Sequence, residues 1–126
     1  MKQAKLCLAL MLALLCSLTA SAHDFEVDGI YYNIISEEEL KVEVTFRGVH
    51  LDDYFDEYSG EITIPSNVIH DNKTYSVTSI GNQAFYCCGH LSSIRIPKEA
   101  IDIGYYTFCK CNELISVIIP SDSELE

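Results

Sequence analysis

The sequence predicts a mainly β fold: a short solenoid of stacked repeats with parallel strands, preceded by a small antiparallel cap. Two observations support this prediction. Residues 80–97 and 103–120 align at a constant offset of 23 residues without a gap, and such a period is typical of a solenoid. Upstream, Asp28-Gly29 lies between two runs of alternating apolar and polar residues, a pattern that favours a β-hairpin.

The first 22 residues have the pattern of a secretory signal peptide. Lys2 and Lys5 precede an apolar run over residues 6–18, and small residues at 20–22 provide a cleavage site. The run is shorter than the about 20 residues of a membrane-spanning helix. We therefore expect cleavage after Ala22 and export of the remaining chain, either as a secreted or as a cell-surface protein without a transmembrane segment.

A lipid anchor on Cys16 is the alternative to a freely secreted chain. Leu15 precedes this cysteine, where lipoprotein processing normally requires a small residue. The sequence therefore disfavours lipidation.

The mature chain would be strongly acidic and about a hundred residues long, the size of one domain. Without the two lysines of the signal peptide, 6 basic residues stand against 19 acidic ones, a net charge of −13. Nucleic-acid binding depends on Lys and Arg that neutralise phosphates. We therefore expect a protein partner, and no nucleic acid.

Residues 23–60 are predicted to form the N-terminal β cap. After the hairpin at Asp28-Gly29, Val42, Val44 and Phe46 alternate with polar residues and so share one face of a strand. A solenoid needs such a cap, because its first repeat would otherwise expose an apolar end.

Residues 61–126 are predicted to contain the repeats. A partial repeat with a hairpin insertion covers 61–79, with the turn near Asp71-Asn72, and two full repeats cover 80–102 and 103–126. The last six residues, SDSELE, are either a short polar cap or the lead-in to further copies.

The 23-residue period lies in the range of leucine-rich repeats, in which each unit contributes a short strand to a stacked solenoid. In each repeat the apolar residues at fixed positions would face the interior. The predicted core of the repeats consists of Phe85, Cys88, Leu91, Ile94 and Ile96, and of their equivalents Phe108, Cys111, Leu114, Val117 and Ile119.

Four cysteines remain in the mature chain. Cys88 and Cys111 share a repeat position at which leucine-rich repeats turn an Asn or Cys inward, so we interpret them as buried thiols. Cys87 and Cys109 occupy variable positions on neighbouring rungs, where a disulfide is possible if their Cβ atoms converge. The spacing does not match a zinc site. We therefore predict no metal and no cofactor.

The phrase I-G-x-x-A-F-x-x-C-x-x-L-x-x-I-x-I-P, as it stands in residues 80–97, resembles the repeat of the BspA-like leucine-rich repeat family. That family comprises exported or surface proteins of host-associated bacteria, and its members usually carry more repeats than the two full ones here. The resemblance implies an interaction or adhesion module directed toward surface proteins of a host or a neighbouring cell, and no enzymatic activity.

Alternation along the strands places the candidate binding residues on the outward side of the repeats: Ser92, Arg95, Ile115 and Ile118. Two alternatives stay open. One is a small metal-binding or thiol-redox module that uses the four cysteines and His90, although His90 aligns with Glu113 and is therefore expected to be solvated. The other is an inactive N-terminal fragment of a longer repeat protein.

Overall fold

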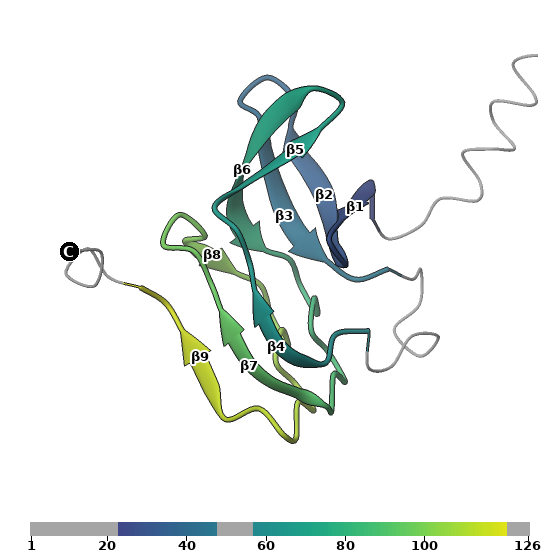
Figure 1. The fold of residues 1–126 in the computed structure, drawn as a ribbon, viewed down its shortest axis with the longest axis vertical. Helices are drawn as coiled ribbons and strands as arrows, with labels where there is room; N and C mark the ends of the chain where they lie inside the picture. The colour runs from purple at the N-terminus through teal and green to yellow at the C-terminus, as the bar shows by residue number, and fades with distance from the viewer. Residues whose placement is uncertain (1–22, 48–56, 121–126) are drawn as a thin grey trace, which may run out of the picture.

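The structure is a computed structural model of the 126-residue chain and describes residues 23–47 and 57–120. The predicted signal peptide, with Cys16 and its cleavage site, lies outside the described residues, as does the tail 121–126. Within the described ranges the chain forms nine strands in two sheets and no helix (Figure 1). The mainly β solenoid that the sequence predicts is therefore confirmed.

One sheet is a ladder of three parallel strands, β4 (Gly60–Thr63), β7 (Leu91–Arg95) and β9 (Ser116–Ile118). Strand β7 lies between the other two (Figure 1). Ser93 pairs with Ser116, so the strand register equals the 23-residue offset of the sequence. The sequence repeat therefore corresponds to one turn of the solenoid, which we call a rung.

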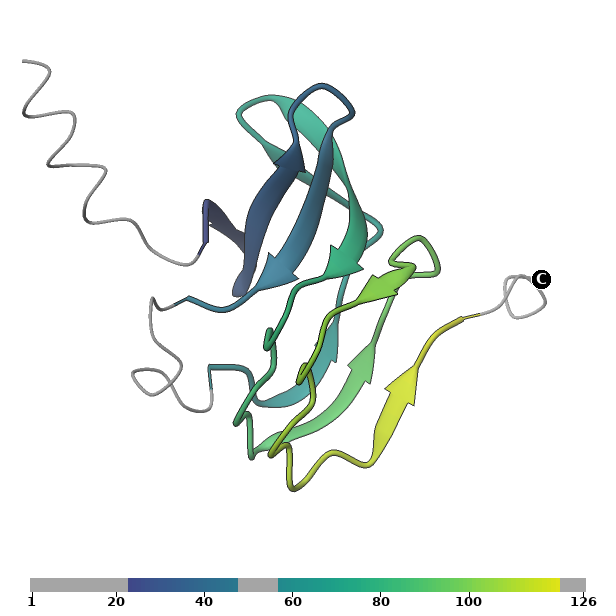
Figure 2. The ribbon, with the colours of Figure 1, turned by 180° about the vertical axis from the view of Figure 1, so that it is seen from behind.

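The second sheet contains the other ladder of the solenoid. Strand β6 (Lys73–Ile80) pairs in parallel with β3 (Lys41–Thr45) on one side and with β8 (Asp102–Ile103) on the other. Seen from behind, these three strands lie side by side (Figure 2). The first rung thus consists of β3 and β4, the middle rung of β6 and β7, and the last rung of β8 and β9.

The N-terminal cap is continuous with this second ladder. Strands β1 (Phe25–Val27), β2 (Ile30–Ser36) and β3 pair antiparallel in sequence order, as the sequence predicts. The turn between β1 and β2 has φ of 51° at Asp28 and 83° at Gly29, the left-handed values of a tight hairpin turn. The parallel pairing of β3 with β6 was not predicted, and it makes the last cap strand the first strand of a solenoid ladder.

The insertion in the partial repeat forms a hairpin of β5 (Asn67–His70) and β6. His70 pairs with Lys73, so the two-residue turn is Asp71-Asn72, the position inferred from the sequence. Both turn residues have positive φ, which Asp and Asn tolerate better than most residues. The hairpin extends β6 beyond the length that the solenoid needs.

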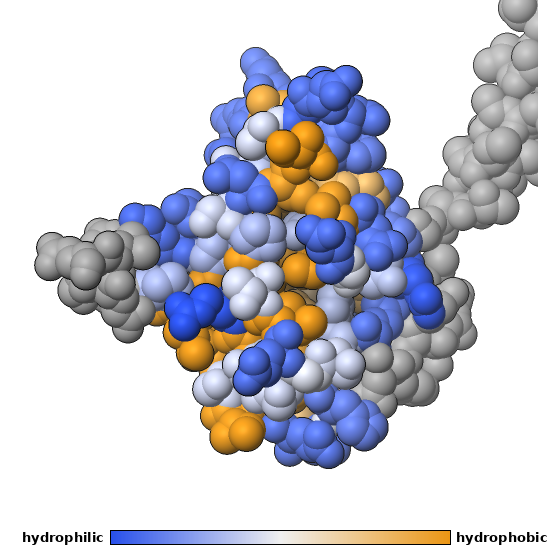
Figure 3. Space-filling model, viewed as in Figure 1, coloured by the Kyte–Doolittle hydropathy of each residue, from blue (hydrophilic) through white to orange (hydrophobic). Residues whose placement is uncertain are grey.

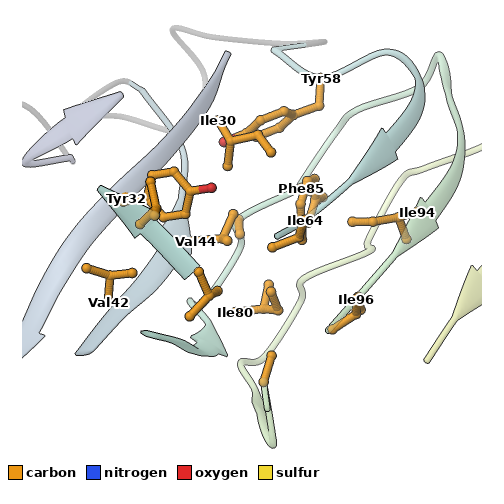
Figure 4. Close-up of a cluster of buried hydrophobic side chains, with 14 of the residues drawn as sticks. Ile30, Tyr32, Val42, Val44, Tyr58, Ile64, Ile80, Phe85, Ile94 and Ile96 are labelled. Carbon is orange, nitrogen blue, oxygen red and sulfur yellow. The ribbon is translucent and has the colours of Figure 1, made fainter. Parts of the chain in front are cut away.

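The core lies between the two sheets (Figure 4). Tyr58 is 2% exposed and its ring lies 4.7 Å from that of Phe85, centroid to centroid. The Tyr58 hydroxyl donates to the Thr45 carbonyl at 2.6 Å and accepts from the Tyr31 amide at 3.1 Å. Because Tyr31 and Thr45 are paired residues of β2 and β3, this hydroxyl bridges the end of their ladder.

The conserved spacing of the repeat glycines follows from the stacking of rungs. A Cβ on Gly104 would lie 2.5 Å from the amide nitrogen of Asn82 on the rung below, and one on Gly81 would lie 3.0 Å from the Val44 carbonyl oxygen. Neither glycine has a positive φ. Their role is therefore to allow close approach of neighbouring rungs, not the tight turn for which glycine is often used.

Burial of the predicted core residues differs between the two repeats. In the middle rung Phe85, Cys88, Leu91, Ile94 and Ile96 are all at most 2% exposed. In the last rung Phe108, Cys111 and Leu114 are only partly buried, and Val117 and Ile119 are 41% and 52% exposed. The reason is that no described residue packs beyond β9, so these side chains contact the core on one side only.

Candidate interaction surfaces

The outer side of the β4–β7–β9 sheet presents a surface in strict register. Each of its rungs contributes two outward side chains, and we call this set the outward face: Glu61, Thr63, Ser93, Arg95, Ser116 and Ile118. Thr63, Arg95 and Ile118 form one row across the strands. The surface is short and mixed in character, with one exposed cation, one exposed carboxylate, hydroxyls and one aliphatic side chain.

The four predicted binding residues lie in neighbouring pairs. Arg95 is exposed and pairs with Ile118, which is half-buried. Ser92 accepts a backbone hydrogen bond from Ile115 at 2.8 Å, and Ile115 is 86% exposed. Apolar surface lies along β9 in Figure 3. Sequence alternation alone missed the contribution of β4, because the offset from β4 to β7 includes the hairpin insertion and is not 23 residues.

A groove of about 660 Å³ crosses the opposite ladder, over β3, β6 and β8. Its aliphatic lining comes from Ile35, Ile101 and Ile103. Its charged lining consists of one lysine and four carboxylates: Lys41, Glu39, Glu43, Glu99 and Asp102. Lys41 forms a 2.8 Å ion pair with Glu39, which leaves the lining acidic. No sequence signal pointed to this groove, because its walls come from the cap, the middle rung and the last rung.

The thiols at the shared repeat position face the interior. Cys88 is 2% exposed, and its Sγ lies 3.9 Å from the Tyr86 carbonyl oxygen. Cys111 is partly buried, and its Sγ donates to the Phe85 carbonyl of the rung below at 3.0 Å. These weak thiol donors therefore satisfy backbone groups between rungs, the role that an inward Asn or Cys takes in leucine-rich repeats.

Cys87 and Cys109 lie on neighbouring rungs and are linked through the backbone. The Cys87 amide donates to the Cys109 carbonyl at 2.9 Å, and both residues carry free thiols. Cys87 has φ of 58°, and its equivalent Lys110 has φ of 61°. The position is thus a left-handed turn that any repeat must form, and a Cys87–Cys109 disulfide stays a prediction.

Lys110 lies beside these two thiols. Its Nζ is 5.7 Å from the ring centroid of Tyr86, and a hydrogen bond with Tyr86 raises the pKa of Lys110, as do the charges of Cys87 and Cys109 to a smaller degree. An ammonium group near a thiol favours the thiolate form. His90 is exposed on the turn before β7.

Among the described residues, no three His, Cys, Asp or Glu side chains are grouped so that they could hold a metal ion. In the same ranges, no helix has the length and apolar character to cross a membrane.

A family model described as the BspA-type leucine-rich repeat region matches residues 60–125. No match was found among curated proteins. Leucine-rich repeat structures are similar to the chain in three gut-associated or related bacteria, and all three agree on the fold.

A leucine-rich repeat protein from Bacteroides ovatus is 33% identical, with a TM-score of 0.64, over 78% of this chain and 24% of its own. A leucine-rich cell surface protein from Faecalibacterium prausnitzii is 23% identical, with a TM-score of 0.63, over 82% and 25%. One from Bacteroides capillosus is 24% identical, with a TM-score of 0.61, over 75% and 64%. The chain thus spans about a quarter of the length of the first two.

Proposed function

Because this chain belongs to the BspA-type leucine-rich repeat family, we propose that it is an exported, non-enzymatic adhesion module that binds a surface protein of a host or neighbouring cell. Leucine-rich repeats of this kind are generally protein-binding modules. The observation that carries the proposal is the outward face, on which three rungs align side chains that the core does not use.

Two further observations support export and a surface role. The first 22 residues have the composition of a signal peptide, and one structural relative is described as a cell surface protein. N-terminal sequencing of the protein secreted by an expressing bacterium tests the first point. We expect the sequence to begin at His23. Retention of residues 1–22 would argue against export by signal cleavage.

Arg95 is the central contact in the proposed outward face. It lies on the middle strand, between Thr63 and Ile118, and its side chain is exposed. A guanidinium group can form two parallel hydrogen bonds with one carboxylate. The proposed partner surface therefore presents a carboxylate that is flanked by an aliphatic contact for Ile118.

A cell-binding assay tests this proposal. The protein is labelled with a fluorophore and titrated onto intact epithelial cells and onto cells of neighbouring bacteria, with and without prior protease treatment. We expect saturable binding that protease treatment removes. We also expect Arg95→Glu to weaken it by at least about tenfold, as is typical for a central arginine of an interface.

Glu99→Lys is the matched control, because it also changes charge on an exposed residue but lies in the groove of the other ladder. It should leave binding unchanged. If Glu99→Lys abolished binding while Arg95→Glu did not, the groove and not the outward face would be the contact surface. Thiol titration combined with metal analysis tests the alternative of a redox or metal module, for which bound zinc that is lost on mutation of Cys88 would be decisive.

A further inference from the structure

The last rung is more apolar on its outward side than the rung below it. At five positions whose side chains point away from the core, a polar residue of the middle rung is replaced by a large apolar one 23 residues later. The replacements, from middle to last rung, are Thr78 to Ile101, Asn82 to Tyr105, Gln83 to Tyr106, Ser92 to Ile115, and Arg95 to Ile118. Stacking of rungs does not require this change, because outward positions do not contact the next rung.

The end of the same rung is also apolar. Ile103, Val117 and Ile119 are 42%, 41% and 52% exposed, whereas the equivalent residues of the middle rung, including Ile80 and Ile94, are at most 1% exposed. The last rung therefore presents a continuous apolar surface on its end and on its rim. We call this surface, residues 101–119 of the last rung, the terminal surface.

The terminal surface is large enough for a stable interface. Its seven most exposed apolar residues are between 41% and 86% exposed. If a fully exposed residue of this size presents about 150–200 Å², they expose on the order of 700 Å². The largest apolar patch of a typical monomer is about 300–600 Å², and one side of a standard interface is about 800 Å².

Charge favours contact between copies at this place over any other. The chain as a whole carries a net charge of −11, whereas residues 101–120 contain only Lys110 against Asp102 and Glu113. Two copies would therefore repel each other least through their last rungs. The three acidic residues of the tail, 121–126, follow directly and would oppose close approach at low salt.

The architecture restricts how copies can associate. The opposite end of the solenoid is occupied by β1 and β2, which continue the sheet beyond the first rung. Head-to-tail stacking, in which the end of one copy packs on the start of the next, is therefore blocked. The remaining arrangement is contact between two equal ends, which has two-fold symmetry and closes as a dimer.

We propose that the terminal surface is a docking site for a second copy of this chain, with the last rungs of the two copies packed against each other around a two-fold axis. This association is independent of the outward face and of the cell-surface partner proposed above. It covers the apolar residues that the last rung leaves exposed.

Sedimentation equilibrium of the protein expressed from its full 126-residue sequence tests this inference. We expect the apparent mass to double as the protein concentration rises. The association should strengthen when salt is raised from about 0.05 M to about 0.5 M, because salt screens the acidic tails and does not weaken apolar contact. A protein that remains monomeric at every concentration, or forms open-ended aggregates, would overturn the proposal.

The variant to test is Tyr105→Asn combined with Ile115→Ser, which gives the last rung the residues of the middle rung at both positions. Because the middle rung already folds with these residues, the variant should keep its far-ultraviolet circular dichroism spectrum. We expect its dimer dissociation constant to be at least about tenfold higher. Ile69→Thr, at a 68% exposed isoleucine of the β5 hairpin, is the matched control and should not change it. Equal weakening in both variants would also refute the proposed surface.

Discussion

Removal of one buried hydroxyl should measurably destabilise the fold. In Tyr58→Phe, the Thr45 carbonyl loses a 2.6 Å donor and the Tyr31 amide loses a 3.1 Å acceptor, in a place where the tyrosine is 2% exposed. A buried backbone group without a partner costs about 1–3 kcal/mol. We therefore expect the free energy of unfolding to fall by about 2–4 kcal/mol. Urea unfolding followed by circular dichroism would show a midpoint roughly 1–2 M lower.

Tyr75→Phe is the matched control for this experiment. The Tyr75 ring is also buried, but its hydroxyl bonds at 3.0 Å to the carboxylate of Glu37, an exposed residue that water can solvate instead. The expected loss is below about 1 kcal/mol. If the two variants lost the same stability, or if Tyr58→Phe lost less than about 0.5 kcal/mol, the bridging role of the Tyr58 hydroxyl would be refuted.

Three further predictions concern stability. Gly104→Ala should cost about 1–3 kcal/mol, because its Cβ would lie 2.5 Å from the Asn82 amide nitrogen; an unchanged urea midpoint would show that the rungs can separate without cost. Ile94→Ala should cost about 2–5 kcal/mol and Val117→Ala clearly less, because Ile94 is fully buried and Val117 is 41% exposed; similar losses in thermal unfolding would contradict the open last rung. Burial, with a smaller effect of a nearby carboxylate, raises the pKa of Tyr32 to about 12. The unfolded chain therefore releases this proton first, near its ordinary pKa of 10, so stability should fall as pH rises from 10 toward 12, and Tyr32→Phe should reduce that fall in a series of urea midpoints.

The parts of the fold that the sequence predicted are those in which one residue position has one structural cause. Ile94 and Val117 share a register because neighbouring rungs place them side by side. Asp28-Gly29 and Asp71-Asn72 marked both hairpin turns, since few residue types accept the left-handed backbone that such turns need. These signals are local or strictly periodic, and they can be recognised without knowledge of the remaining chain.

The parallel pairing of β3 with β6 left no comparable signal. Val42 pairs with Val77, at a separation that is unrelated to the 23-residue period because the first partial repeat carries an insertion. The groove was hidden for the same reason, since its lining depends on that pairing. The predicted outward residues Arg95 and Ile118 do lie side by side, but the row continues to Thr63 of β4, which has no counterpart at the repeat offset.

The position of Cys87 shows a different limit of sequence reasoning. Its thiol invited a chemical explanation because its equivalent in the next repeat is Lys110 and not cysteine. In the structure both residues adopt a left-handed backbone conformation, with φ near 60°. Neither Cys nor Lys is typical of such a position, so residue type alone could not indicate the turn.

The pairing of β3 with β6 has a consequence for the order in which the chain opens. Each later rung contacts only the rung before it, whereas β6 has neighbours on both edges: β3 on one, β5 and β8 on the other. Amide hydrogen exchange should therefore be slowest in β3 and β6 and fastest in β8 and β9, as fraying proceeds from the last rung toward the cap. Folding would run in the reverse direction, because the closure of residues 41–45 on 76–80 creates the template on which every later rung is added.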